Sequence, residues 1–344
     1  MRFTFPIVTL SKGGAQRMLA EVANGLAEKG HDITILLSKS GVIEFDMKAT
    51  IKVVPDHFPI DSFPPADVIV SNFYTTVPPC QLAAEKGLGT HIRYTHCYEP
   101  IFMPNQAETF LSYHVTPHLF VVSEAQKKLV DVNHGLNAKV IPNGINPVFK
   151  NLHTKKTNGP LQISAIVRLS EGGLWHRQQN YLIEQLRIVK LAHPEVQINL
   201  FCPPAELTIS KSLQEIKMLN EFTFHTPAND QELCMLYNQT DIFVTSSIFE
   251  SSLLTGLEAM ACGAALVTTY AGGNMDYAKH YKNCLVSSRM DNQLSKDIMT
   301  LIKDPFLRHY LIVNGEAEAK KWTIQRTVDT FEEKAREILT RLGQ

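Results

Sequence analysis

Neither positive nor negative charge is in excess in this chain. Its 344 residues include 33 Lys or Arg and 34 Asp or Glu, so the formal net charge at pH 7 is −1. A protein that binds nucleic acid mainly through the phosphate backbone needs a clear excess of basic residues. The composition therefore argues against nucleic acid as a partner.

Long apolar segments are also missing. No stretch of the sequence approaches the length needed to span a bilayer. The apolar residues 3–10 are few and run straight into Ser11-Lys12-Gly13-Gly14 without a small-residue cleavage site, so we do not expect a signal peptide. We expect a soluble cytoplasmic protein with at most peripheral membrane contact.

Cysteine is sparse and scattered. The six cysteines include no CxxC pair. In a chain of this length, this pattern predicts reduced and mostly buried thiols, and neither a disulfide framework nor a zinc site. The sequence also lacks an Asp-x-Asp triad and a histidine cluster. We therefore expect no metal ion and no cofactor.

The composition that remains is typical of a well-buried globular protein, with 44% hydrophobic and 19% charged residues. The length allows two domains of ordinary size. We expect residues 2–8 to form a strand, 11–17 a glycine-containing loop, 18–27 a helix and 31–37 a second strand. This βαβ order predicts a parallel sheet.

The first loop contains two adjacent glycines, Gly13 and Gly14, which allow the backbone to approach a ligand closely. Its sequence is neither GxGxxG nor a P-loop, so neither nicotinamide nor ATP binding follows from it. A tight turn without a ligand is the alternative interpretation.

Residues 242–263 form the stretch around which the rest of the chain can be understood. The apolar run 242–244 is typical of a buried strand. After a small polar segment, apolar residues recur at helical spacing and Gly263 ends the element, the positions being Leu253, Leu257, Met260 and Ala261. The pattern predicts a strand, a loop and a helix.

Polar residues of this stretch can form a ligand site. Ser251 or Ser252 can cap the helix, whose first N–H groups and partial positive charge attract an anion. Glu250 and Glu258 flank that end, where they can hold the hydroxyls of a sugar nucleotide while the helix holds its diphosphate. For the spacing alone, one loop glutamate and one solvated helix glutamate are the alternative.

Glu250, seven further residues, Glu258 and then Ala-Met-Ala-Cys-Gly resemble the retaining glycosyltransferases of the GT4 family. Other matching segments follow the family order along nearly the whole chain: Gly13-Gly14-Ala15-Gln16-Arg17, Ile141-Pro142-Asn143-Gly144, Arg168-Leu169 and Ala271-Gly272-Gly273. The resemblance implies an α/β fold of the GT-B type, with two Rossmann-like parallel-sheet domains facing across a cleft.

The resemblance also implies a division of the chain into three parts. Residues 1–155 are expected to form the acceptor-side domain, and residues 156–322 the domain that binds the nucleotide sugar. The boundary follows from the linker-like composition of residues 151–160. Residues 323–344 are expected to form a helix that packs back on the first domain.

The resemblance assigns a role to each residue of the central site. Glu250 contacts the donor sugar and steadies positive charge at its anomeric carbon, and Glu258 binds the ribose. The donor diphosphate is held by Arg168, by backbone N–H groups of the helix start (Ser251, Ser252, Leu253 and Leu254) and by the segments that contain Gly13, Gly14 and Asn143.

This sequence departs from the family pattern in two places. The family Lys five residues after Arg168 is missing because position 173 is Gly, and residues 171–176 look like an insertion. Counting back from the next helix places Arg177 where the Lys would fall, and its guanidinium can serve the same purpose. Asn146 replaces the usual Asp after the Ile-Pro-Asn-Gly segment.

A further candidate site follows the expected strand 91–94. His96 and Glu99 lie just past its carboxyl end, where ligands of open α/β sheets bind. The segment Tyr98-Glu99-Pro100 resembles family members that synthesise bacterial surface polysaccharides, which implies that His96 contacts the donor sugar and Glu99 the acceptor. The alternative is a hydrogen-bonded loop histidine and a residue that starts a helix.

Together these features predict a metal-independent retaining glycosyltransferase. It would move a hexose or deoxyhexose from a nucleoside diphosphate sugar to a hydroxyl of a saccharide or lipid-linked saccharide, in cell-envelope or capsular polysaccharide synthesis. Two alternatives stay open: a phosphorylase or epimerase of the same architecture, and a degenerate protein that binds nucleotide sugars without turnover.

Overall fold

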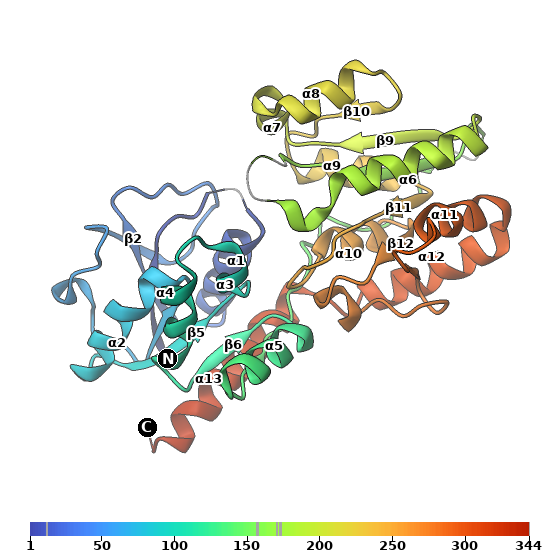
Figure 1. Cartoon of the computed structure of the whole chain (residues 1–344). Helices are drawn as coiled ribbons and strands as arrows, with labels where there is room; N and C mark the ends of the chain where they lie inside the picture. Colours follow the sequence, from blue (N-terminus) through green and yellow to red (C-terminus); the bar gives the residue numbers. More distant parts are fainter. Residues whose placement is uncertain (12, 156–157, 170, 172–173, 344) are drawn as a thin grey trace. The chain divides into compact units, whose positions relative to one another are not determined.

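The computed structural model describes all residues except 12, 156–157, 170, 172–173 and 344. Lys12 of the expected glycine loop, and Gly172 and Gly173 of the expected insertion, lie outside the described residues. The chain forms two compact units, the first from Met1–Gly144 with Ile324–Gln344 and the second from Ile145–Thr323 (Figure 1). No helix in the described part of the chain is both long and apolar enough to cross a membrane.

The first unit contains a parallel sheet of seven strands in the order β3-β2-β1-β4-β5-β6-β7. Parallel pairing requires a crossover after each strand, and helices or short turns supply it. The strands are β1 (Arg2–Ile7), β2 (Asp32–Ser38), β3 (Thr50–Val54), β4 (Val68–Ser71), β5 (Thr90–Tyr94), β6 (Leu119–Val121) and β7 (Lys139–Val140). The helices are α1 (Gly14–Glu28), α2 (Val77–Glu85), α3 (Glu99–Phe102), α4 (Gln106–Leu111), α5 (Glu124–His134) and α13 (Ile324–Arg341).

The alternation of side chains along β1 divides the core of the first unit between the two faces of the sheet. Phe3, Phe5 and Ile7 lie in a cluster with the apolar residues of α1 and α13. Phe331 of α13 packs edge-on against Phe120 of β6, with ring centroids 5.3 Å apart (Figure 1). The last helix of the chain therefore completes the core of the first unit.

The second unit contains a parallel sheet of six strands in the order β10-β9-β8-β11-β12-β13. The strands are β8 (Gln162–Ile166), β9 (Gln197–Phe201), β10 (Thr223–His225), β11 (Ile242–Val244), β12 (Ala265–Thr269) and β13 (Leu285–Ser287). The helices are α6 (Gln179–Ala192), α7 (Pro204–Ile209), α8 (Lys211–Met218), α9 (Asp230–Asn238), α10 (Leu254–Ala261), α11 (Gln293–Lys303) and α12 (Pro305–Ala319).

Strand β11 shows how both faces of this second sheet are covered. Ile242 and Val244 lie in a cluster with α6 and α11, whereas Phe243 lies in a cluster with α9 and α10. The strand order turns back between β8 and β11, which are neighbours in the sheet but not in sequence. In open α/β sheets this reversal leaves a crevice at the carboxyl ends of the two strands.

The two units join at residues 144 and 145, and residues 145–155, which were expected in the first domain, pack on the second unit. The N–H of Leu152 donates to Oδ1 of Asn238 (2.7 Å). The Lys155 ammonium donates to the carbonyl of Gly263 (2.9 Å). The polar composition of this segment resembled that of a linker, but its polar groups bond to the second unit instead of to solvent.

Candidate functional site

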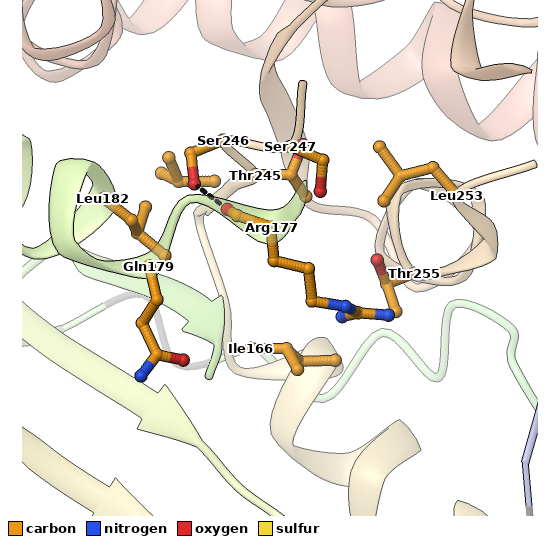
Figure 2. A pocket seen from close by; sticks show the side chains of 10 residues that line it. Ile166, Arg177, Gln179, Leu182, Thr245, Ser246, Ser247, Leu253 and Thr255 are labelled. Carbon is orange, nitrogen blue, oxygen red and sulfur yellow. Dashed lines mark hydrogen bonds between the residues drawn. The ribbon is translucent and has the colours of Figure 1, made fainter. Parts of the chain in front are cut away.

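The loops after β8 and β11 meet at the crevice of the second unit, as the strand order requires. A small cavity of about 20 Å³ lies there. Figure 2 shows its lining, which comes from β8, from the start of α6, from the end of β11 and from the start of α10: Ile166, Arg177, Gln179, Leu182, Val244, Thr245, Ser246, Ser247, Leu253 and Thr255. The stretch 242–263 thus supplies half of a real site.

Helix α10 starts without the serine cap that its sequence predicted. Its cap residue is Leu253, in the left-handed region (φ 54°, ψ 58°), and no side chain caps the helix. The expected capping role of Ser251 and Ser252 is therefore wrong. Leu253 has its carbonyl oxygen bonded by the hydroxyl of Tyr277 (2.8 Å), which helps to hold this strained backbone.

The reason for the displaced cap is the glycine turn after β12. The N–H of Glu250 donates to the carbonyl of Ala271 (2.7 Å), and the N–H of Gly273 donates to the carbonyl of Glu250 (2.8 Å). A Cβ at Gly273 would lie 2.0 Å from the carbonyl oxygen of Ser251. Because residues 250–252 are pressed against this turn, the helix can begin only after them.

Arg177 is the cation of the cavity. In Figure 2 its side chain runs toward Leu253 and Thr255, at the start of α10. Its backbone carbonyl accepts a hydrogen bond from the Ser246 hydroxyl (2.8 Å). Its Nε is buried and makes no hydrogen bond within the described part of the chain. A guanidinium and the positive end of a helix lie together here, so the site attracts an anion.

Glu250 lies beside this cation. Its Oε1 is 3.8 Å from Nε of Arg177 and 3.7 Å from Nε2 of His176, and it accepts a hydrogen bond from the Ser247 hydroxyl (2.9 Å). Burial lowers the pKa of His176, and Arg177 adds to this effect although Glu250 opposes it. The imidazole is therefore neutral at pH 7, and Arg177 is the charged partner of Glu250.

Glu258 lies on α10, one turn into the helix, where the spacing predicted it. The hydroxyl of Tyr237, from α9, donates to its Oε2 (3.2 Å). Burial, with Glu258 as a further cause, raises the pKa of Tyr237 well above its usual range. The phenol therefore stays protonated and orients the carboxylate.

Arg168 differs from the expectation because its guanidinium already holds a carboxylate. Its Nε lies 2.8 and 2.9 Å from the two oxygens of Glu206, and its Nη2 also bonds to Glu206. Glu206 further accepts from the N–H of Leu169 (2.8 Å). Burial would raise the pKa of Glu206, but these bonds hold it below its usual value. Arg168 is thus neutralised in part, and Arg177 is the more open cation.

Sequence reasoning missed Glu206 because it considered the loop after β8 alone. Glu206 follows β9, which is paired with β8 along its whole length. Because parallel strands end at one edge of the sheet, a carboxylate just after β9 comes close to an arginine just after β8. This adjacency was the available signal.

The other predicted residues belong to the first unit. Gly13 is the cap residue of α1, and Gly14 begins that helix, so the loop expected over residues 11–17 ends earlier. Both ring nitrogens of His96 are buried and make no hydrogen bond with the described residues, and burial lowers the pKa of His96 to about 3. Oδ1 of Asn143 is also buried without a hydrogen bond to the residues that the structure describes.

Glu99 is not available to an acceptor, contrary to the expectation. It begins α3, as the alternative proposed, and its Oε2 lies 3.0 Å from Nη2 of Arg93. Both side chains are almost completely buried. Arg93 lies on the central strand β5 and also lies over the ring of Tyr113 (3.9 Å). A buried guanidinium needs a carboxylate, and Glu99 serves this purpose.

Comparison with known proteins adds a family to this geometry. Residues 172–318 match the model of a family described as "Glycosyl transferases group 1". An uncharacterised glycosyltransferase of Methanocaldococcus jannaschii is 29% identical over 91 residues, which are 26% of this chain and 23% of that protein. The chain therefore spans about a quarter of the length of the curated relative that it matches.

Three solved structures resemble the whole chain. HepE from Anabaena, in complex with UDP, has a TM-score of 0.79 at 17% identity and covers 98% of this chain and 100% of its own. Sucrose-phosphate synthase from Thermosynechococcus elongatus has a TM-score of 0.76 at 15% identity, covering 99% of each chain. The catalytic domain of starch synthase IV from Arabidopsis thaliana, bound to ADP and acarbose, has a TM-score of 0.73 at 14% identity, covering 98% of this chain and 99% of its own.

These likenesses and the two parallel sheets confirm the prediction of a GT-B fold. The match to the family model supports the resemblance to GT4 glycosyltransferases in the second unit, which contains residues 172–318.

Proposed function

We propose that this protein transfers a sugar from a nucleoside diphosphate sugar to an acceptor hydroxyl, with retention of the anomeric configuration. The observation that carries the proposal is the guanidinium of Arg177 at the start of α10, with Glu250 beside it. A nucleoside diphosphate is an anion of suitable size for this position. The family match of residues 172–318 supports the same chemistry.

The donor is assigned to the second unit group by group. The backbone at the start of α10, residues 251–254, and Arg177 hold the diphosphate, and Glu258 binds the ribose hydroxyls. Arg168 adds a second contact to the diphosphate through Nη1, because Glu206 uses its Nε and Nη2. The solved structures of HepE with UDP and with UDP-glucose support a uridine nucleotide as the first donor to test.

The proposed reaction depends on charge stabilisation. As the bond between the anomeric carbon and the diphosphate breaks, negative charge grows on the diphosphate and positive charge on the sugar. Arg177 and the N–H groups of α10 stabilise the first, and Glu250 stabilises the second. The acceptor hydroxyl attacks from the face that the diphosphate leaves, which retains the configuration. We assign the stabilisation of the leaving group to these residues without a metal ion.

The first unit is proposed to contribute His96, Asn143 and the Gly13-Gly14 turn. The buried nitrogens of His96 and the buried Oδ1 of Asn143 have unused hydrogen-bonding capacity, which a sugar hydroxyl would satisfy. The neutral imidazole can both donate and accept. A saccharide or lipid-linked saccharide acceptor, and a role in cell-envelope or capsular polysaccharide, are proposed from the family resemblance alone.

The proposal is tested first by binding and then by transfer. Calorimetry with UDP, GDP, dTDP and ADP and their sugar conjugates identifies the donor, and NMR of the glycoside product reports its anomeric configuration. Inversion would refute retention. Donor hydrolysis or epimerisation without any acceptor requirement would favour a sugar-phosphate enzyme instead. Donor binding without turnover toward any acceptor would favour a binding protein.

The ribose assignment has its own test in Glu258→Ala. We expect nucleotide affinity to fall about 10- to 100-fold, because a charge-assisted hydrogen bond to the ribose is lost. Tyr237→Phe, which keeps the carboxylate but removes the hydroxyl that orients it, should weaken binding less. Unchanged nucleotide affinity in Glu258→Ala would remove the assignment.

A further inference from the structure

A second cavity adjoins the first at the carboxyl end of β8 and has a volume of about 290 Å³. It shares Arg177 and Gln179 with the first cavity. Its remaining lining comes from the end of β8, the segment before α6 and the first turn of that helix: Arg168, Leu174, Trp175, Gln178, Asn180 and Tyr181. The proposed handling of the nucleotide uses neither Trp175 nor Tyr181.

Trp175 presents an aromatic face in this cavity, because its side chain is 49% exposed. Its backbone is held in a single 3-10 turn, η5 (Trp175–Arg177), and its carbonyl accepts both from the N–H of Gln178 (3.1 Å) and from the Gln178 amide (3.0 Å). Gln178 is in the left-handed region (φ 53°), which is strained for a residue with a side chain. Such strain persists where the surroundings impose it, and it is common at ligand sites.

Two fixed polar groups of the cavity lining lack hydrogen bonds. Nε2 of Gln179 and the hydroxyl of Tyr181 are buried and have no hydrogen-bond partner among the described residues. The amide of Gln179 is oriented because its Oε1 accepts from the N–H of Arg168 (2.8 Å). The ring of Tyr181 is oriented by the guanidinium of Arg289, 4.0 Å from its centroid.

An aromatic face beside fixed and unsatisfied polar groups fits a saccharide ring. The C–H faces of a pyranose are apolar and stack on an aromatic ring, and its hydroxyls take the hydrogen bonds. A purely apolar ligand would leave Gln179 and Tyr181 unsatisfied, which is costly for buried groups. The chemistry of the cavity therefore points to a sugar.

The position of Arg177 indicates which sugar. Arg177 lies in both cavities, and on its one side it faces α10, which carries Glu258. On its other side lies Trp175, whose ring is perpendicular to that of His176 at 6.0 Å, and His176 in turn adjoins Glu250. Ribose, diphosphate and transferred sugar follow each other in the donor, as Glu258, Arg177 and Trp175 do here.

We propose that Trp175 is the platform on which the transferred sugar of the donor rests, with Gln179 and Tyr181 bonding its hydroxyls. This inference rests on the proposed function and adds a residue that determines which sugar is accepted. It is a feature of the segment 171–176, which the sequence comparison had treated as an insertion.

The test compares a nucleotide with its own sugar conjugate, in the absence of acceptor. Dissociation constants for UDP and UDP-glucose, GDP and GDP-mannose, and ADP and ADP-glucose are measured by calorimetry for the wild type, and the best-bound pair is kept. In Trp175→Ala we expect the sugar conjugate to bind about tenfold more weakly and the nucleotide to bind as before. Trp175→Phe should stay close to the wild type.

Tyr281→Ala is the matched control, because Tyr281 is a similarly exposed aromatic residue (53%) of the second unit that lines neither cavity. Fluorescence gives a second readout, since the chain has two tryptophans and Trp322 is buried. Emission should change with the sugar conjugate more than with the nucleotide, and this difference should vanish in Trp175→Phe.

Each outcome decides between the two proposals. Equal losses for nucleotide and conjugate, or no loss for either, would overturn the role of Trp175 and leave the proposed function standing. If the wild type bound none of the nucleotides or conjugates, the proposed function itself would fail. A loss confined to the conjugate in Trp175→Ala, with Tyr281→Ala unchanged, would support the inference.

Discussion

At the scale of single residues, the site depends on which carboxylate each arginine meets. Arg168 is bonded side-on to Glu206, whereas Arg177 lies 3.8 Å from Glu250 without a hydrogen bond to it. The two residues follow one strand and have the same chemistry. Their partners differ because Glu206 comes from the neighbouring strand β9 and Glu250 from the loop after β11. Arg177 therefore keeps more of its charge for a ligand.

We predict that Arg177→Ala lowers turnover by about 10²- to 10³-fold, as the loss of one group that stabilises a developing charge does. Arg168→Ala should lower turnover less, because Glu206 already neutralises part of that charge. Arg187→Ala, in an exposed pair with Glu221 on α6, is the control and should change little. Steady-state kinetics with the identified donor provides the comparison. A larger effect at Arg168 than at Arg177 would contradict this ranking.

At the scale of elements, the turn after β12 decides where α10 begins. The backbone of Glu250 is bonded on both sides to residues 271–273, so the polar loop behaves as an added strand edge. The helix start, with its uncapped N–H groups, is positioned by this pairing and not by a serine side chain.

Gly273→Ala tests this dependence. The added Cβ would meet backbone atoms of Ser251 and Ser252 at 2.0–2.7 Å, so the loop must move. We expect a loss of about 1–3 kcal/mol in the free energy of unfolding, measured by denaturant titration, together with weaker nucleotide binding. Gly14→Ala is the control for stability, since a Cβ there meets nothing within 4 Å. Unchanged nucleotide binding in a folded Gly273→Ala protein would contradict the argument.

The attachment of α13 to the first unit is a second dependence at this scale. Glu332 pairs with Lys29 and with His31, whose Nε2 lies 3.0 Å from its Oε1. Burial alone would raise the pKa of Glu332, but hydrogen bonds from Lys29, Arg336 and His31 lower it from 4.5 to about 2. A carboxyl with a lowered pKa stabilises the fold above its unfolded value, and this contribution is lost as the pH falls through its folded value.

We therefore predict that stability falls between about pH 4.5 and pH 2 more steeply in the wild type than in Glu332→Gln. At pH 7 this variant should be less stable by on the order of 1 kcal/mol, as for a partly exposed pair. Glu333→Gln, at an exposed neighbouring position, should follow the wild type. Denaturant titrations of the three proteins across this pH range provide the measurement. Parallel curves for the wild type and Glu332→Gln would contradict the assignment.

At the scale of the whole molecule, the chain builds two separate cores, and its last helix belongs to the first of them. Phe331 contacts Phe3, Phe5 and Phe120 although more than two hundred residues separate it from each of them. The proposed donor site lies in the second unit. Stability and donor binding are therefore expected to respond to different mutations.

Calorimetric unfolding tests this separation. Phe331→Ala should destabilise the first unit by about 3–5 kcal/mol and lower its transition by about 10 °C or more. The transition of the second unit should stay in place and should rise when the nucleotide is added. Phe306→Ala, at a position 87% exposed, is the control with little expected effect. One transition that moves as a whole in Phe331→Ala would show that the units do not unfold separately.

The sequence alone determined the order of the elements, the parallel sheets and the GT-B fold, because hydrophobic periodicity and the Glu-x₇-Glu motif are local patterns that survive without knowledge of distant contacts. It also placed Glu250, Glu258 and Arg177 in one region, since all three follow strands that end at one edge of the sheet. Only the tertiary structure decided the partners: Glu206 for Arg168, Glu99 for Arg93, and Leu253 in place of a serine at the start of α10. Each of these depends on which segments distant in sequence touch, and no local pattern in the chain encodes that contact.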